Sequence, residues 1–197
     1  MDNLFSTENE LISRIEKERL LSQLGICIWL TGLSGSGKTT IAKYVSKKLH
    51  DKGILTQVLD GDNIRLGINK NLSFSVEDRI ENIRRTAEIS KLFVQCGVVT
   101  ICCLVSPSED IRQLAKKIIG EKDFYEVFIN TSLDICEKRD TKGLYKKARK
   151  GEINDFTGIS SNFETPKNSA LNITTEGKSI EESGELLLKE ILTKINS

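Results

Sequence analysis

The sequence predicts an α/β fold in which helices cover both faces of a parallel β-sheet. Apolar runs of strand length alternate with amphipathic segments of helix length from residue 26 onward. One of these strand–helix units contains a glycine-rich loop at residues 32–39. Alternating strands and helices favour a parallel sheet, and ligands of such sheets bind beyond the carboxyl ends of the strands. We therefore expect one functional site where those ends meet.

Length and composition favour one main domain. The chain has 197 residues and a formal net charge of +1, so a strongly basic surface for nucleic acid is not expected. No apolar run reaches the length of a membrane span, and the first residues lack the pattern of a signal peptide. We expect a cytoplasmic protein with no nucleic-acid or membrane partner. A helical extension at residues 1–24 would precede the domain at residues 25–197.

The first half of the chain is predicted to form two strands and three helices. Ser6 and Thr7 are candidate caps of the first helix, whose apolar face would pack on the domain or on a partner subunit. Residues 63–75 are polar and expected to be irregular, and a capping-box variant at residues 75–78 would begin the third helix. The strands are expected at residues 26–30 and 54–59, and the helices at residues 6–22, 40–49 and 75–95.

The second half continues the alternation. The run at residues 98–105 is apolar almost throughout, as is typical of a strand buried on both faces. Gly120 would end the helix that follows, and residues 140–168 show little periodicity and much charge. Strands are expected at residues 98–105, 124–129 and 170–173, and helices at residues 108–119, 132–139 and 179–195.

The glycine-rich loop GLSGSGKT at residues 32–39 fits the phosphate-binding pattern G-x-x-x-x-G-K-[ST]. Its glycines let backbone N–H groups approach phosphate oxygens, Lys38 supplies a positive charge, and the Thr39 hydroxyl can bind Mg²⁺. A glycine- and serine-rich surface turn is the alternative, but the buried strand before the loop and the helix after it favour a nucleotide site. The predicted ATP-binding residues are Gly32, Ser34, Gly35, Ser36, Gly37, Lys38, Thr39 and Thr40.

Charged residues follow the other strands at the same predicted edge. Asp60 and Asp62 come directly after a strand and could serve a metal ion and the attacking nucleophile, although a solvated acidic turn is the alternative. Arg65, Arg79 and Asn82 could hold a second anionic group, or could belong to a solvated helix face. Six basic residues between 139 and 150 could form a lid over a phosphate site, where a charged surface helix is the alternative.

Seven motifs in order resemble those of adenylylsulfate kinases, enzymes that phosphorylate adenosine 5′-phosphosulfate at the ribose 3′-hydroxyl. The resemblance runs from about residue 20 to the end of the chain. The motifs are IWLTGLSGSGKT at 28–39, LDGDNIR at 59–65, NKNLSF at 69–74, DRIENIRR at 78–85, SP at 106–107, KRDTKGLYKKAR at 138–149 and FTGI at 156–159.

The resemblance implies a P-loop nucleoside-kinase-like three-layer sandwich with a basic lid at about residues 140–168, two nucleotide substrates, ATP with Mg²⁺, and a homodimer. It implies that Asp60 reaches the metal ion with Thr39 and that Asp62 orients the acceptor hydroxyl. The implied catalytic residues are Lys38, Asp60, Asp62 and Ser106. The implied acceptor-binding residues are Asp62, Arg65, Phe74, Arg79, Asn82, Ser106, Lys142, Phe156 and Phe163, with Phe74 and Phe163 on either side of the acceptor adenine. Arg139 would lie against the base of ATP.

Two departures from the family pattern concern the acceptor. Residues 108–112 read SEDIR where many relatives have an aromatic residue and further arginines, and Asn154-Asp155 stand where many have Lys-Gly. Two other functions therefore remain open. One is a paralogous kinase that acts on another nucleotide-like anion, such as a cytidine diphosphoramidate used in polysaccharide modification. The other is a regulatory subunit that binds ATP without turnover, which the presence of Lys38, Asp60 and Asp62 disfavours.

Overall fold

Five parallel strands form the central sheet of the computed structural model, which describes residues 5, 7 and 10–195. In sheet order they are β2 (Thr56–Asp60), β3 (Val99–Cys103), β1 (Ile26–Thr31), β4 (Phe124–Asn130) and β5 (Leu171–Thr174). Every neighbouring pair is parallel. The predicted α/β fold with a parallel sheet is confirmed.

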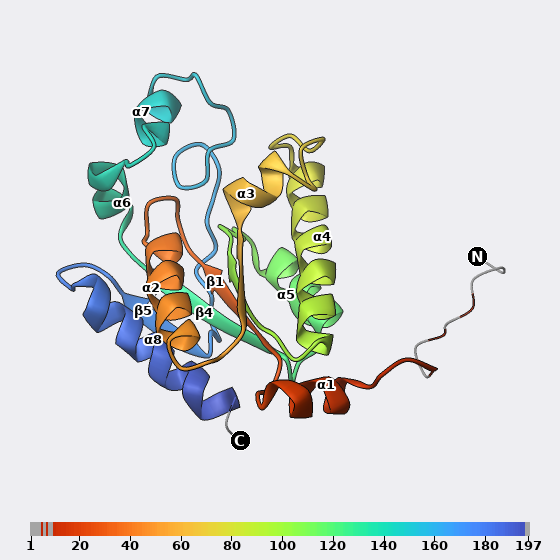
Figure 1. Cartoon of the computed structure of the whole chain (residues 1–197). Coiled ribbons are helices and arrows are strands. Elements are labelled where there is room, and N and C mark those ends of the chain that lie inside the picture. Colours follow the sequence, from red (N-terminus) through yellow and green to blue (C-terminus); the bar gives the residue numbers. More distant parts are fainter. Residues whose placement is uncertain (1–4, 6, 8–9, 196–197) are drawn as a thin grey trace.

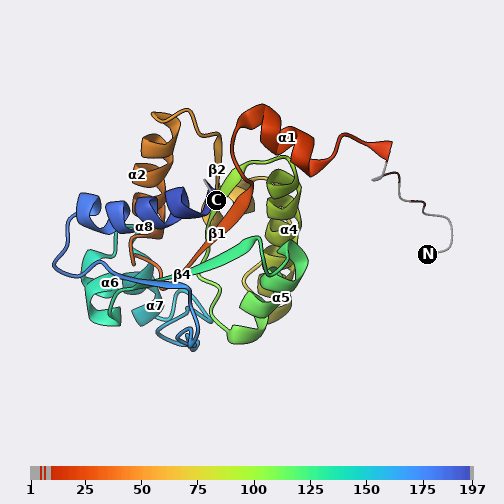
Figure 2. The same cartoon turned by 90° about the horizontal axis from the view of Figure 1, so that it is seen from below.

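Helices cover both faces of this sheet and make three layers (Figures 1 and 2). α2 (Lys38–His50) and α8 (Ile180–Ile195) lie on one face, and α4 (Val76–Gln95) and α5 (Glu109–Ile119) lie on the other. Strand β1 serves both layers because its side chains alternate. Ile28 and Leu30 belong to the core with α2 and α8, while Trp29 belongs to the core with α4 and α5.

Three short helices differ from the expectations. The first is shorter than predicted, and the other two lie in segments expected to be irregular. α1 covers only Arg14–Leu21, not residues 6–22. Its N-cap is Ser13, whose side chain forms a capping box with Glu16. Ser6 lies outside the described residues, and Thr7 is exposed and precedes the helix by several residues. Ser13 was not among the predicted caps, and its capping box with Glu16 explains why the helix begins there.

The other two helices lie near the site. α3 (Gly61–Leu66) starts in the acidic turn and occupies part of the segment expected to be irregular, because the Asp60 side chain caps it by accepting from the Asp62 amide. α7 (Leu144–Arg149) lies in the predicted lid, where the Asp140 carboxylate accepts from the amides of Tyr145 and Lys146. α6 (Leu133–Arg139) matches its predicted range closely. None of the helices among the described residues is long and apolar enough to cross a membrane.

Candidate active site

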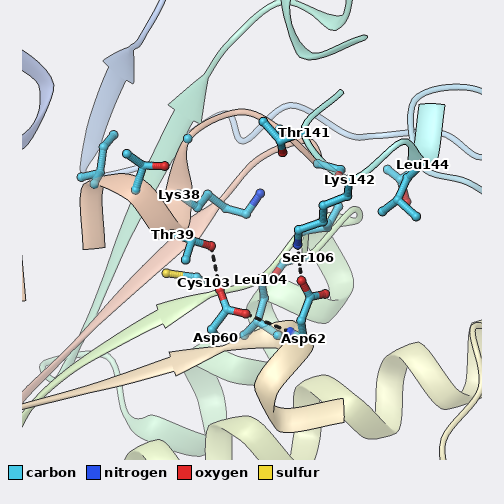
Figure 3. Close-up of a pocket in the computed structure, with 18 of the residues that line it drawn as sticks. Lys38, Thr39, Asp60, Asp62, Cys103, Leu104, Ser106, Thr141, Lys142 and Leu144 are labelled. Atoms are coloured by element: carbon cyan, nitrogen blue, oxygen red, sulfur yellow. Dashed lines mark hydrogen bonds and ion pairs between the residues drawn. The ribbon is translucent and has the colours of Figure 1, made fainter. Parts of the chain in front are cut away.

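A cavity of about 500 Å³ lies beyond the carboxyl ends of β1, β2 and β3. Its walls come from segments far apart in the sequence: the phosphate loop, α3, the start of α4, the turn after β3, the lid and the start of α8. Figure 3 shows how Lys38, Asp60, Asp62, Ser106 and Lys142 gather around it. Most of the residues selected from the sequence therefore lie in one place.

The phosphate loop is held in shape by its own contacts. Gly32 has a φ of 145°, and a Cβ atom there would lie 2.6 Å from the Ile129 carbonyl oxygen, so only glycine fits. The Lys38 ammonium donates to the carbonyl oxygens of Gly32 at 2.8 Å and Leu33 at 2.7 Å. Burial lowers the pKa of Lys38 to about 8. The lysine thus lies folded back on the loop, where a phosphate could replace the carbonyl oxygens as its partner.

The remaining predicted ATP-binding residues divide into two groups. Gly32 and Ser36, although part of the loop, are buried. The Ser36 carbonyl accepts from the hydroxyl of Thr131 at 2.9 Å. The residues that line the cavity are Ser34, Gly35, Gly37, Lys38, Thr39 and Thr40.

A hydroxyl and a carboxylate meet at the end of the phosphate loop. Thr39 Oγ1 donates to Asp60 Oδ2 at 2.6 Å, and Asp60 Oδ1 accepts from the Asp62 amide at 3.1 Å (Figure 3). Mg²⁺ in nucleotide enzymes takes one or two protein oxygens, with phosphate oxygens and water in its other positions. Thr39 and Asp60 supply oxygens of this kind at the expected place. Among the described residues no group of three or more His, Cys, Asp or Glu could hold a metal ion.

Asp62 pairs with a residue of the lid. Its carboxylate forms an ion pair with the Lys142 ammonium, which reaches across the cavity from the segment between α6 and α7 (Figure 3). Both side chains are more than half exposed. Asp62 and Lys142 are both predicted acceptor-binding residues, and their ion pair joins opposite sides of the cavity.

The two arginines predicted to bind the acceptor contact backbone groups and an aromatic ring. The Arg65 guanidinium lies 4.3 Å from the centre of the Phe74 ring. Arg79 donates from Nε to the Phe74 carbonyl, from Nη1 to the Thr157 hydroxyl and from Nη2 to the Asp155 carbonyl. Burial lowers the pKa of both arginines. The contacts of Arg79 with Asp155 and Thr157 hold the lid loop near the start of α4.

Asn82 also lines this end of the cavity. Its Oδ1 accepts from Asn69 Nδ2 at 2.9 Å, and both amides are buried. Because Oδ1 has this partner, the Asn82 Nδ2 donors are the part of the amide available to an anion. Asn69 belongs to one of the motifs used for the family resemblance, but its role was not predicted.

The two predicted adenine-binding rings are placed differently. Phe74 is 59% exposed and lines the cavity. Phe163 is not among the lining residues and stacks on Phe128 with ring centres 5.9 Å apart. The structure therefore does not place Phe163 at the acceptor end beside Phe74. Phe156 does line the cavity and packs edge-on against Tyr145.

Ser106 adopts a left-handed backbone conformation that two buried side chains support. Its φ is 46°, its hydroxyl accepts from Trp29 Nε1 at 3.0 Å, and its carbonyl accepts from Arg112 Nη1 at 2.9 Å. Arg112 is fully buried and also pairs with Glu126. Since the Ser106 hydroxyl accepts from Trp29, its own proton is free to be donated into the cavity. Neither Trp29 nor Arg112 was predicted to support the site. A Trp in an apolar run is typical of the hydrophobic core.

The other end of the cavity is built from the lid and α8. Arg139 donates to the side-chain and main-chain oxygens of Thr175, at 3.0 and 3.2 Å, next to the phosphate loop. The sequence offered no motif for this end beyond Arg139. At this end, the lining residues that were not predicted include Thr175, Lys178, Ser179, Ile180 and Ser183.

Comparison with known proteins identifies the family. Residues 24–174 match the family model described as adenylylsulphate kinase. This chain belongs to the adenylylsulphate kinase family. The resemblance found in the sequence motifs is thereby confirmed.

Close relatives cover nearly the whole chain. The adenylyl-sulfate kinase of Bacteroides fragilis (strain YCH46) is 53% identical over 195 residues, which are 99% of this chain and 96% of the relative. That of Bacteroides thetaiotaomicron is 54% identical over 194 residues, 98% of this chain and 96% of the relative. Membership of this enzyme family therefore does not depend on the motifs alone.

A solved family member has the same fold. The APS kinase of Mycobacterium tuberculosis in complex with AMPPNP and APS is 46% identical, with a TM-score of 0.82 over 86% of this chain and 98% of that chain. A gluconokinase from Sinorhizobium meliloti, 14% identical with a TM-score of 0.59 over 87% of this chain and 94% of that chain, shares the fold alone.

Proposed function

We propose that this protein transfers the γ-phosphoryl group of ATP to the ribose 3′-hydroxyl of adenosine 5′-phosphosulfate, which gives 3′-phosphoadenosine 5′-phosphosulfate and ADP. The observation that carries the proposal is one cavity with a phosphate loop in its floor, Asp62 beside the loop and two arginines at one end. The 46% identical relative solved with AMPPNP and APS supports both substrates.

The donor phosphates would lie on the phosphate loop. Loop N–H groups and the N-terminus of α2 favour anionic ligands there. Lys38 would exchange its bonds to the Gly32 and Leu33 carbonyls for the β- and γ-phosphate oxygens. Thr39 and Asp60 would hold Mg²⁺, which neutralises charge on the phosphates when it is bound. Arg139 would lie against the base of ATP.

Asp62 would orient the acceptor hydroxyl for in-line attack. To do so it must give up the ion pair with Lys142, which then becomes available to the anionic tail of the acceptor. Arg65, Arg79 and Asn82 would bind that tail, with the free proton of the Ser106 hydroxyl as a further donor. Catalysis would rest on positioning and electrostatics, as is usual for phosphoryl transfer.

The acceptor adenine would stack on Phe74 after Arg65 leaves the ring. A clamp with Phe163 on the other side requires that residue to leave Phe128, so it would form as the lid, about residues 140–168, closes. Phe156 would take part in the same closure from its place in the cavity wall. Closure of this kind excludes water from the transferred phosphoryl group.

We further infer that residues 1–24 form an N-terminal extension of the catalytic domain at residues 25–197, and that the protein acts in the cytoplasm as a homodimer. The support is the family resemblance and, for the extension, the small size of α1. Light scattering on the purified protein measures the oligomeric state directly, and a monomer mass would refute the dimer.

A paralogous kinase acting on another nucleotide-like anion is the second candidate. Asp155 favours this second function. Its carboxylate places a negative charge beside Arg79, where the acceptor anion would bind. The phosphate loop, Asp60 and Asp62 would serve either reaction.

Product analysis tests the proposal. With Mg²⁺, ATP and adenosine 5′-phosphosulfate, the protein should form ADP and 3′-phosphoadenosine 5′-phosphosulfate in equal amounts by ion-exchange chromatography. Lys38→Ala should keep the fold, verified by circular dichroism, and lose turnover by orders of magnitude. Formation of ADP without the phosphorylated nucleotide, or full turnover by the Lys38→Ala variant, would sink the proposal.

A further inference from the structure

The lid helix α7 is joined to the phosphate loop by the hydroxyl of Tyr145. This hydroxyl donates to the Ser34 carbonyl at 2.9 Å. Tyr145 is 1% exposed and does not line the cavity, whereas Ser34 and Gly35 do. Burial raises the pKa of Tyr145, so the hydroxyl keeps its proton and remains a donor at neutral pH. Tyr145 belongs to one of the motifs used for the family resemblance, but no role was predicted for it.

The contact with Tyr145 fixes the direction of one peptide group of the loop. The described residues include no cis peptide bond, and in a planar trans peptide the C=O and the N–H point in opposite directions. Because the Ser34 carbonyl points to the Tyr145 hydroxyl, the Gly35 N–H points away from it. None of the described residues accepts a hydrogen bond from this N–H. The Gly35 N–H is therefore available to an anion in the cavity that Gly35 lines.

Tyr145 differs in one respect from Lys38, which also donates to carbonyls of the loop. In the proposed reaction Lys38 would leave the carbonyls of Gly32 and Leu33 for phosphate oxygens. Tyr145 lies outside the cavity wall and has no phosphate to reach. Its bond to the Ser34 carbonyl can therefore persist while the donor is bound.

The ring of Tyr145 is held by contacts that do not involve its hydroxyl. It packs edge-on against Phe156, with ring centres 5.0 Å apart. The backbone N–H of Tyr145 donates to Asp140 Oδ1 at 3.0 Å. A phenylalanine at this position would keep both contacts and lose only the bond to the Ser34 carbonyl.

We propose that Tyr145 is a positioning residue for the phosphoryl donor. Its hydroxyl holds the Ser34–Gly35 peptide in the orientation that directs the Gly35 N–H at a donor phosphate oxygen. A hydrogen bond to a charged phosphate is stronger than one between neutral groups, and a donor group that is already oriented costs less to bind. The inference rests on the donor half of the proposed function and is independent of the identity of the acceptor.

Calorimetry with Mg²⁺ and the ATP analogue AMPPNP tests the proposal on Tyr145→Phe. The dissociation constant should rise about 3- to 10-fold, the range expected when one hydrogen bond is no longer held in position. The melting temperature without nucleotide should fall only slightly, and the increase that AMPPNP produces should shrink. The KM for the acceptor should not change, because the ring stays against Phe156.

Tyr125→Phe is the matched control. The Tyr125 hydroxyl donates to Glu190 Oε2 at 3.0 Å, and neither residue lines the cavity. This variant loses a tyrosine hydrogen bond of nearly the same length and should also lower the melting temperature slightly. Its AMPPNP dissociation constant should equal that of the wild type. An equal loss of affinity in both variants would mean that the effect is a general loss of stability, and would overturn the proposal.

Two further results separate this inference from the proposed function. A wild-type AMPPNP dissociation constant in Tyr145→Phe would overturn the role of Tyr145 and leave the proposed reaction in place. No AMPPNP binding by the wild type would overturn both. If Tyr145→Phe weakens AMPPNP binding and the wild type does not phosphorylate adenosine 5′-phosphosulfate, the role of Tyr145 holds and only the acceptor assignment is wrong.

Discussion

Asp62 pairs with the Lys142 ammonium in the structure and would bind the acceptor hydroxyl in the proposed reaction. Asp62→Asn keeps the shape of the side chain and removes its charge. We expect kcat to fall at least about 100-fold, the usual scale for loss of a general base, with little change in AMPPNP affinity or in stability, because the ion pair is exposed. Steady-state kinetics and calorimetry measure both. A loss of AMPPNP affinity with normal kcat would make Asp62 a metal ligand.

The lowered pKa of Lys38 leads us to expect that nucleotide binding is linked to proton uptake. Burial lowers its pKa to about 8, and a bound phosphate should raise it again, so nucleotide binding should take up a proton above about pH 8. Calorimetry of AMPPNP binding at pH 8.5, in two buffers with different ionisation enthalpies, should reveal this uptake. Lys38→Met should abolish it, and equal binding enthalpies for the wild type in both buffers would contradict the prediction.

Lys38 also affects how the free energy of unfolding depends on pH. Its pKa in the folded protein is below the ordinary value of 10.5, so between about pH 8 and pH 10.5 the unfolded chain binds more protons. The contribution of Lys38 to the free energy of unfolding therefore rises with pH across that window.

At the residue scale, the sequence located residues of the cavity where a charged or glycine residue stood in a motif. Lys38, Asp60 and Asp62 lie together in the cavity because the ends of parallel strands meet. Trp29 and Arg112 carried no such signal. Their local patterns are those of a core strand and of an amphipathic helix, and their roles depend on what tertiary packing places beside them.

The lid loop contains a strained residue at a position where many family members have glycine. Asp155 has a φ of 54°, which glycine adopts at lower cost. Asp155→Gly should stabilise the protein by about 0.5 kcal/mol. It should also lower the KM for the acceptor, because a negative charge beside Arg79 is removed.

Asp155→Asn separates charge from backbone, since asparagine also tolerates the left-handed conformation. It should lower the acceptor KM as Asp155→Gly does and leave the melting temperature nearly unchanged. A wild-type KM in Asp155→Asn would show that the charge has no influence on the acceptor.

α1 is attached to the domain mainly by polar contacts. Arg14 donates to both carboxylate oxygens of Asp123, at 2.6 and 2.9 Å, and to the Gly25 carbonyl at 2.8 Å. Arg14→Ala should lower the free energy of unfolding by about 1 kcal/mol, discounted for partial exposure, and leave both KM values unchanged. Chemical denaturation and kinetics measure these quantities. A changed KM would show that α1 communicates with the cavity.

At the element scale, long periodic segments were predictable and short polar helices were not. β1, β3 and β4 are apolar runs, and α4 has a cap and a clear period. α3 and α7 have six residues each, too few to show a helical period. Asp60 caps α3, and the Asp140 carboxylate accepts from two amides in the first turn of α7, whose N-cap is Gly143.

At the scale of the whole molecule, the acceptor end of the cavity is held by contacts between protein groups. Lys142 forms an ion pair with Asp62, the Asp155 carbonyl accepts a hydrogen bond from Arg79, and the Arg65 guanidinium lies over the Phe74 ring. In the proposed reaction an acceptor would exchange these contacts for its own, which would couple its binding to movement of the lid. The sequence predicted a lid, but it held no information on which contacts the lid makes before substrate binds.

The identity of the acceptor is tested most directly by comparing kcat/KM with Mg²⁺ and ATP across a panel. The panel contains adenosine 5′-phosphosulfate, adenosine 5′-diphosphate, cytidine 5′-diphosphate and a cytidine diphosphoramidate. We predict the highest kcat/KM for adenosine 5′-phosphosulfate, because an adenine can stack on Phe74 while its anionic tail reaches Arg65 and Arg79. A higher kcat/KM for any other member of the panel would contradict the proposed substrate and leave only the fold and phosphoryl transfer in place.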